Sequence, residues 1–194
     1  DFSDNGDGTV TLTDYYPKLS DSTDVVIPST VSRNSDGQWT EGDTFTATAI
    51  ADGSYNSHQD SLSNGVFAHQ DITSVVLPDT IEYIGECAFF NCSGLASITL
   101  PSSLTSIRNH VFDYCDNLQP SITDDNGVKY LGSEQNPYLV LWNGKGITSS
   151  SYTVNPDCKI IYFRAFLYCD SLTSITLPEG LTSIGDYAFQ DCSG

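Results

Sequence analysis

The chain has 194 residues and carries 25 acidic against 7 basic side chains, so its formal net charge is −18 at pH 7. A surface of this charge repels phosphate backbones and anionic lipid headgroups, which argues against nucleic-acid partners and membrane surfaces. No apolar stretch reaches the ~20 residues that a membrane-spanning helix needs, so we expect no membrane insertion within this segment. Hydrophobic residues make up 39% of the chain and charged residues only 16%, and the polar remainder is mostly Ser, Thr, Asn, Asp and Gly, as is typical of β-rich extracellular proteins.

The N-terminal part, residues 1–65, is predicted to form divergent strands with a loop insertion. The glycine-rich opening at residues 3–10 weakly matches a calcium loop, but a hairpin turn explains it better. The polar stretch at residues 54–64 is a candidate contact loop or a connector.

A repeat with a 23-residue period follows this part. Residues 72–92, 95–115 and 172–192 align without gaps, and residues 152–169 form a degenerate copy. The interval from Cys115 to Cys169 exceeds one period by 31 residues, which indicates an insertion. We therefore expect a single domain over residues 1–194, with divergent repeats at 1–65, regular repeats at 66–121, a β-hairpin insertion at 122–152 and regular repeats at 153–194.

Each copy predicts one coil of a solenoid. Residues 97–100 alternate in polarity, which predicts a short strand that Pro101 ends. The Ala-Phe-x-x-Cys segment at residues 188–192 has the spacing of one buried helical turn. One coil cannot bury its own apolar face, so copies should stack with like residues in register. The expected ladder comprises Cys92, Cys115, Cys169, Cys192, Phe89, Phe112, Phe166 and Phe189.

The pattern LxxIxLPxxLxxIGxxAFxxC resembles the leucine-rich repeats of the BspA-like family of bacterial surface proteins, most closely at residues 71–118 and 153–194. Residues 6–15 and 24–31 look like the opening strands of such proteins. This resemblance implies a β-rich α/β fold: a right-handed leucine-rich-repeat solenoid with short parallel strands and helical turns, here with an inserted hairpin. It also implies an extracellular or bacterial cell-surface location, adhesion, and an extracellular or host protein as partner. Arrays in the family commonly continue, so we expect further repeats beyond Gly194.

The six cysteines leave two interpretations open. An even number in a secreted chain suggests disulfides, whereas equivalent positions in successive coils suggest buried, reduced thiols, which we favour. Neighbouring coils can still bring two thiols within bonding distance. No cysteine or histidine spacing matches a zinc site, and no catalytic motif surrounds His58, His69 or His110. We therefore predict no metal, no cofactor and no enzymatic activity.

The insertion contains the candidate ligand-binding residues. Residues 128–131 and 138–142 read as two strands of a hairpin that carries Tyr130, Tyr138 and Trp142, which either bind a ligand or pack the hairpin against the coils. The favoured function is a non-enzymatic interaction module for adhesion or recognition. The alternatives are a structural spacer and a glycan-binding accessory domain of a secreted hydrolase, with Trp39, Trp142 and the tyrosines as sugar platforms. The exposure of the aromatic side chains discriminates between them.

Overall fold

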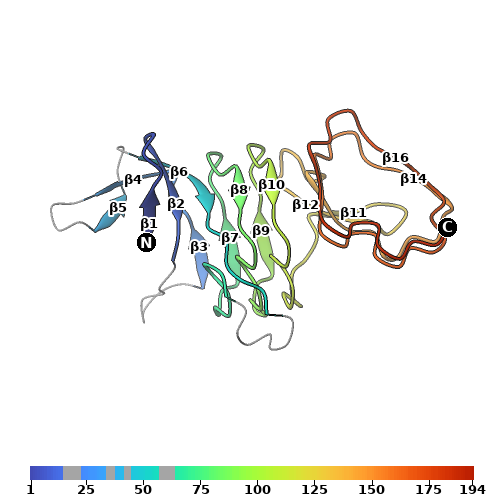
Figure 1. Ribbon diagram of the computed structural model, residues 1–194, viewed down its shortest axis with the longest axis horizontal. Coiled ribbons are helices and arrows are strands. Elements are labelled where there is room, and N and C mark those ends of the chain that lie inside the picture. The colour runs from blue at the N-terminus through green and yellow to red at the C-terminus, as the bar shows by residue number, and fades with distance from the viewer. Residues whose placement is uncertain (15–22, 34–37, 42–44, 57–63) are drawn as a thin grey trace. The chain divides into compact units, whose positions relative to one another are not determined.

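The structure of the chain is a computed structural model that describes residues 1–14, 23–33, 38–41, 45–56 and 64–194 (Figure 1). The chain forms two compact units. The N-terminal unit comprises residues 1–104 and 110–118, and the C-terminal unit comprises residues 105–109 and 119–194. The predicted contact loop at residues 54–64 lies largely outside the described residues, as does His58.

The N-terminal unit begins with a mixed sheet. Its strands are β1 (Phe2–Asp4), β2 (Thr9–Leu12), β4 (Thr30–Arg33), β5 (Trp39–Glu41), β6 (Phe45–Ile50) and β8 (Tyr83–Ile84). Strands β1 and β2 form an antiparallel hairpin across the glycine-rich opening. Strand β6 pairs parallel with β2 and β8 and antiparallel with β4, which in turn pairs antiparallel with β5.

A second sheet of the N-terminal unit is wholly parallel and confirms the predicted short strands. Its members are β3 (Asp24–Val26), β7 (Ser74–Val76) and β9 (Ser97–Thr99). The central residue of each strand is buried, while the last residue of each faces solvent. Ser74 pairs with Ser97, so neighbouring strands repeat at the 23-residue period of the sequence. These strands lie side by side in Figure 1.

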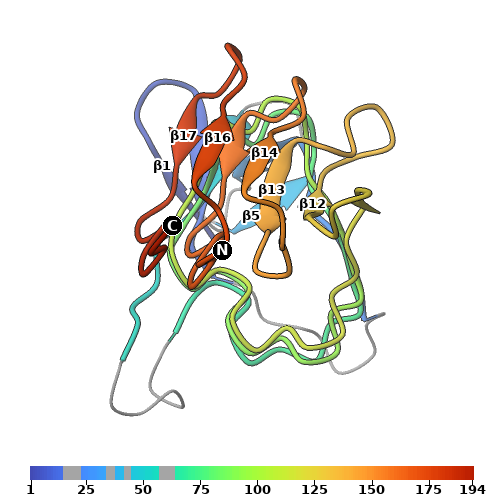
Figure 2. The ribbon, with the colours of Figure 1, turned by 90° about the vertical axis from the view of Figure 1, so that its right-hand side faces the viewer.

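The C-terminal unit contains the remaining strands. They are β10 (Ser106–Ile107), β11 (Ile122–Thr123), β12 (Lys129–Leu131), β13 (Val140–Asn143), β14 (Ser151–Thr153), β15 (Ile160–Ile161), β16 (Ser174–Thr176) and β17 (Ser183–Ile184). Strands β12 and β13 form the expected antiparallel hairpin. Strand β13 also pairs parallel with β15, and β15 with β17, so the hairpin is built into the stacked coils (Figure 2). Strands β14 and β16 form a separate parallel pair.

The predicted helical turns are wrong, because left-handed residues interrupt these segments. Between Gly185 and Cys192 the backbone forms successive turns in which an N–H group donates to the carbonyl three residues earlier. In one of them the Gln190 N–H donates to the Tyr187 carbonyl at 3.0 Å. Tyr187 and Asp191 have φ angles of 57° and 56°, whereas a right-handed helix needs a φ near −60°. We call the residues with such angles at these turns the corner residues. They are His69, Cys87, Asn91, His110, Tyr114, Arg164, Tyr168, Tyr187 and Asp191.

Phenylalanine rings stack along the coils inside each unit. In the N-terminal unit Phe89 lies between Phe67 and Phe112, with ring centroids 4.9 and 6.0 Å away and interplanar angles of 8° and 11°. In the C-terminal unit Phe166 and Phe189 stack at 5.1 Å. The near-parallel rings give each coil the same apolar surface to present to the next, as a repeat fold requires.

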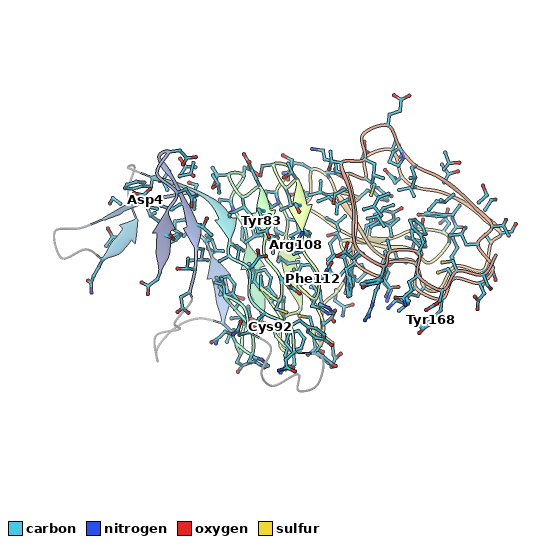
Figure 3. The ribbon with its side chains drawn as sticks, viewed as in Figure 1. Asp4, Tyr83, Cys92, Arg108, Phe112 and Tyr168 are labelled. Atoms are coloured by element: carbon cyan, nitrogen blue, oxygen red, sulfur yellow. The ribbon has the colours of Figure 1, made fainter. Side chains whose placement is uncertain are left out.

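The cysteines line these columns, and the ladder thiols donate to a backbone carbonyl of the preceding coil. Cys92 donates to the Phe67 carbonyl at 2.9 Å, and Cys115 donates to the Phe89 carbonyl at 3.1 Å. Figure 3 shows Cys92 and Phe112 in the coils of the N-terminal unit. All six cysteines are free in the structure, and burial raises the pKa of the Cys92 thiol to about 12.

A glycine takes the place of one phenylalanine in the C-terminal unit. The Cys169 thiol donates to the Gly144 carbonyl at 3.4 Å, where the next thiol, Cys192, donates to the Phe166 carbonyl at 3.1 Å. A Cβ atom on Gly144 would lie 2.4 Å from Cε1 of the Phe166 ring. The absent side chain therefore makes room for the first ring of this column.

Candidate interaction surface

The three aromatic side chains that are predicted to bind a ligand differ in their exposure. Tyr130 is fully buried, whereas Tyr138 and Trp142 are half-buried. The Tyr138 ring packs edge-on against Tyr130 at 5.2 Å. Because β12 lies inside the sheet of the coils, the inward side of the hairpin serves as core. The burial of Tyr130 favours packing of the hairpin, one of the two roles that the sequence left open, and ligand binding by Tyr130, Tyr138 and Trp142 stays a prediction.

Tyr130 belongs to a buried chain of hydroxyl groups. Its phenol hydrogen-bonds to the Tyr152 phenol, which donates to Oδ2 of Asp124 at 2.6 Å. The other Asp124 oxygen accepts the Asn126 and Val128 N–H groups, each at 2.9 Å. Burial raises the pKa of Tyr130 to about 12 and also raises the pKa of Tyr152. These phenols stay protonated at neutral pH and connect the hairpin to the coil.

Replacement of Tyr152 by phenylalanine is expected to lower the free energy of unfolding by about 1–3 kcal/mol, because the Tyr130 hydroxyl and the Asp124 carboxylate lose a partner away from bulk water. Urea unfolding followed by circular dichroism measures the change. The control is Tyr168→Phe, which removes an exposed hydroxyl and should change the stability by less than about 0.5 kcal/mol. Equal effects of the two substitutions would contradict a stabilising role for the chain of hydroxyls.

Two exposed valines lie next to each other on the outer face of the parallel sheet. Val26 is 71% exposed and Val76 is 43% exposed, and the two are paired in register on β3 and β7. The same row continues with Thr99 on β9. In the C-terminal unit the equivalent row contains Thr153 and Thr176. The N-terminal unit therefore exposes apolar side chains where later coils expose threonine.

Val26 also lines a cavity of about 330 Å³ in the N-terminal unit. Its lining residues are Asp1, Phe2, Leu12, Asp14, Val25, Val26, Ile27, Pro28 and Phe67. The walls are mostly apolar, and two acidic side chains lie among them. We call Val26, Val76 and this cavity the valine patch. Adjoining exposed and concave apolar surfaces are typical of protein-interaction sites.

Three exposed tyrosines occupy corner positions that sequence reasoning missed. Tyr114, Tyr168 and Tyr187 are 48%, 66% and 59% exposed, and their φ angles lie between 57° and 61°. A signal was present in the repeat, because the residue before the ladder cysteine is Tyr114 or Tyr168 in two copies but Asn91 or Asp191 in others. Asparagine and aspartate tolerate the left-handed conformation, whereas a tyrosine in it is unusual.

The histidines of the described residues have structural partners. His110 Nδ1 lies 2.8 Å from Oδ2 of Asp113, and its ring stacks on Tyr55 at 3.7 Å. His69 Nδ1 lies 2.9 Å from Nδ2 of Asn91. In the described part of the chain, no three histidine, cysteine, aspartate or glutamate side chains are grouped as metal ligands would be. The same residues include no helix with the length and hydropathy to cross a bilayer.

Stacked coils with a 23-residue period, parallel strands and columns of phenylalanine and cysteine define a leucine-rich-repeat protein. The chain matches the BspA-type leucine-rich repeat region in 6 copies, over residues 60–135 and 145–194. This match covers more than half of the chain, which therefore belongs to the BspA-type leucine-rich repeat family. No curated protein sequence matches the chain significantly.

Solved structures of bacterial leucine-rich repeat proteins share the fold. The leucine-rich repeat protein of T. pallidum aligns with a TM-score of 0.52 and 23% identity, over 99% of this chain and 64% of its own. A leucine-rich cell surface protein of Faecalibacterium prausnitzii aligns with a TM-score of 0.52 and 24% identity, over 98% of this chain and 50% of its own. A leucine-rich repeat protein of Bacteroides capillosus aligns with a TM-score of 0.51 and 22% identity, over 91% of each chain. The chain thus spans less than two thirds of the first two proteins.

Proposed function

We propose that the chain is a non-enzymatic interaction module of a bacterial cell-surface protein and that it binds an extracellular or host protein through the valine patch. The observation that carries this proposal is the exposure of Val26 beside Val76, next to a largely apolar cavity. The family match and the similarity in fold to a cell surface protein of Faecalibacterium prausnitzii support the location. Adhesion follows if the partner is anchored to a host surface or matrix.

The chemistry of the valine patch indicates what kind of partner it binds. Exposed valines gain free energy when an apolar surface covers them, by about 25 cal/mol for each Å² removed from water. The cavity is lined by Asp1 and Asp14, and the whole chain has a net charge of −18. Complementary charge speeds association, so the favoured partner presents an apolar side chain with lysine or arginine beside it.

The test is binding of the purified chain to immobilised extracellular matrix proteins, beside a Val26→Thr, Val76→Thr double variant. Threonine occupies this row in later coils, so the variant should fold while its affinity for the partner falls about tenfold. Thr153→Ser and Thr176→Ser together provide the matched control in the C-terminal unit, and their binding should be unchanged. A Tyr138→Ala, Trp142→Ala variant tests the hairpin separately.

Two outcomes would overturn the proposal. Binding that survives in the double valine variant and is lost with Tyr138 and Trp142 would place recognition on the hairpin. A folded chain that binds none of the immobilised proteins would instead favour a structural spacer.

A further inference from the structure

The outer face of the wholly parallel sheet in the N-terminal unit has two rows of side chains. The three strands lie side by side, and each contributes its first and its last residue to this face (Figure 1). Side chains two residues apart on a strand point to the same side, so both rows face outward. The polar row consists of Asp24, Ser74 and Ser97, and the apolar row consists of Val26, Val76 and Thr99.

The exposure of the apolar row is a property of the sheet face. Val76 lies on the middle strand, with β3 paired on one side and β9 on the other, and it is still 43% exposed. A further strand would pair at the edge of the sheet and would not cover this side chain. In α/β proteins, helices cover the faces of parallel sheets. A partner that buries Val76 therefore lies across the strands.

Asp24 places a carboxylate beside the valines. Its Oδ1 atom accepts hydrogen bonds from Ser74 Oγ at 2.6 Å and from Thr73 Oγ1 at 3.1 Å. These bonds hold the carboxylate towards β7, on the same exposed face as Val26. A carboxylate fixed beside apolar side chains favours a partner that brings a lysine or arginine to this position.

The spacing of the apolar row matches a helix. Neighbouring strands lie about 4.8 Å apart, so a partner aligned with the row must present a side chain at about this interval. An extended strand repeats the side chains of one face only every ~6.6 Å, which is too long. A helix advances about 4.5 Å over three residues and about 6 Å over four. Its side chains three or four residues apart can therefore contact Val26 and Val76 in turn.

We propose that the two rows bind an amphipathic α-helix of the partner, with apolar side chains over the valines and a lysine or arginine over Asp24. The rows lie ~6.6 Å apart along the strands, within the ~10 Å width of a helix, so one helix covers both. This inference rests on the proposed function, because it specifies the partner that the valine patch binds.

The charge of the chain selects a basic helix. A net charge of −18 speeds the approach of a basic segment and repels an acidic helix or a second copy of the chain. The C-terminal unit provides an internal comparison, because the equivalent rows of its strand pair contain Ser151 and Ser174, and Thr153 and Thr176. That face has neither valine nor carboxylate and should not bind the helix.

The test uses a synthetic helical peptide of about 21 residues, with leucine at every third or fourth position, lysine beside each leucine and alanine elsewhere. Titration calorimetry measures its binding to the purified chain. The lysine peptide should bind at least about tenfold more tightly than a matched peptide with glutamate in place of lysine. Val26→Thr with Val76→Thr should weaken its binding about tenfold, whereas Thr153→Ser with Thr176→Ser should leave it unchanged.

A charge reversal tests the role of Asp24. Asp24→Lys should bind the glutamate peptide more tightly than the lysine peptide, because the local charge is inverted. The matched control is Asp157→Lys, which makes the same change of charge at an exposed residue of the C-terminal unit and should keep the preference for lysine. In the parent chain with isotope-labelled valine methyl groups, the lysine peptide should shift the signals of Val26 and Val76.

Four results would overturn the inference: the lysine peptide does not bind, both peptides bind equally, Asp24→Lys keeps the preference for lysine, or a peptide with leucine at alternate positions binds as tightly as the helical one. The binding of immobilised matrix proteins distinguishes this failure from that of the proposed function. If those proteins bind the parent chain and lose affinity for the double valine variant, the proposed function stands and only the helical partner is wrong. Loss of both kinds of binding removes the proposed function as well.

Discussion

Replacement of Phe89 by alanine is expected to lower the free energy of unfolding by about 3–5 kcal/mol, a large fraction of the stability of a typical domain. The Phe89 ring has no exposed surface and stacks on a ring in the coil before it and another in the coil after it. Its removal leaves a cavity that both neighbouring rings line. Urea unfolding followed by far-ultraviolet circular dichroism measures the loss.

Phe189→Ala is the matched control for this prediction. Its ring is half-buried and stacks on Phe166 alone among the described rings. Because this ring has one stacked neighbour and part of its surface in water, Phe189→Ala should lower the free energy of unfolding by about half as much as Phe89→Ala. If Phe89→Ala costs no more than Phe189→Ala, the stacked column does not determine the stability of the coils.

Raising the pH above 9 is expected to unfold the chain. Burial raises the pKa of Cys87 and of Cys92 from 9.0 to about 12, and that of Cys158 and of Cys169 to about 11, and it also raises the pKa of Cys115. Below pH 9 these thiols are protonated in both states, so their contribution to stability is fully present. Above pH 9 the unfolded chain loses their protons while the folded chain keeps them. Stability therefore falls by about 1.4 kcal/mol per pH unit for each thiol.

The measurement is the free energy of urea unfolding at half-unit intervals between pH 7 and pH 11. By about pH 10 the five thiols together lower the free energy of unfolding by several kcal/mol, which is comparable to the whole stability of a typical domain. Cys92→Ala should reduce the slope by about 1.4 kcal/mol per pH unit. The non-titrating exposed substitution Thr99→Ala should leave the slope unchanged. A flat profile up to pH 11 would show that the thiols are not buried in the folded chain.

The repeat made most of the fold predictable from sequence. The 23-residue spacing of Ser74 and Ser97 places them opposite each other on neighbouring strands, as the structure confirms. The same register holds for Ser151 and Ser174, although the insertion separates this coil from the regular copies before it. One coil contacts mainly its neighbours, so a periodic sequence specifies both the strand and its partner.

Two features could not be predicted because they depend on backbone angles and on which side of a strand faces the core. The spacing of Ala188 and Cys192 fits a helical turn, but the left-handed angles of Tyr187 and Asp191 turn the chain without a helix. The aromatic Tyr130 reads as a hot-spot residue in isolation. It is buried because β13 joins the parallel strands of the coils and fixes which face of the hairpin points inward.

The corner residues have a consequence for how such a surface diversifies. In the C-terminal unit Arg164 and Tyr168 occupy left-handed turns of one coil, and Tyr187 and Asp191 hold the equivalent positions one period further along the chain. The residues before three of the ladder cysteines, Asn91, Tyr114 and Tyr168, face solvent, while the rings and thiols that hold these coils together are buried. The residue before each ladder cysteine can therefore differ from one coil to the next without any repacking of the interior.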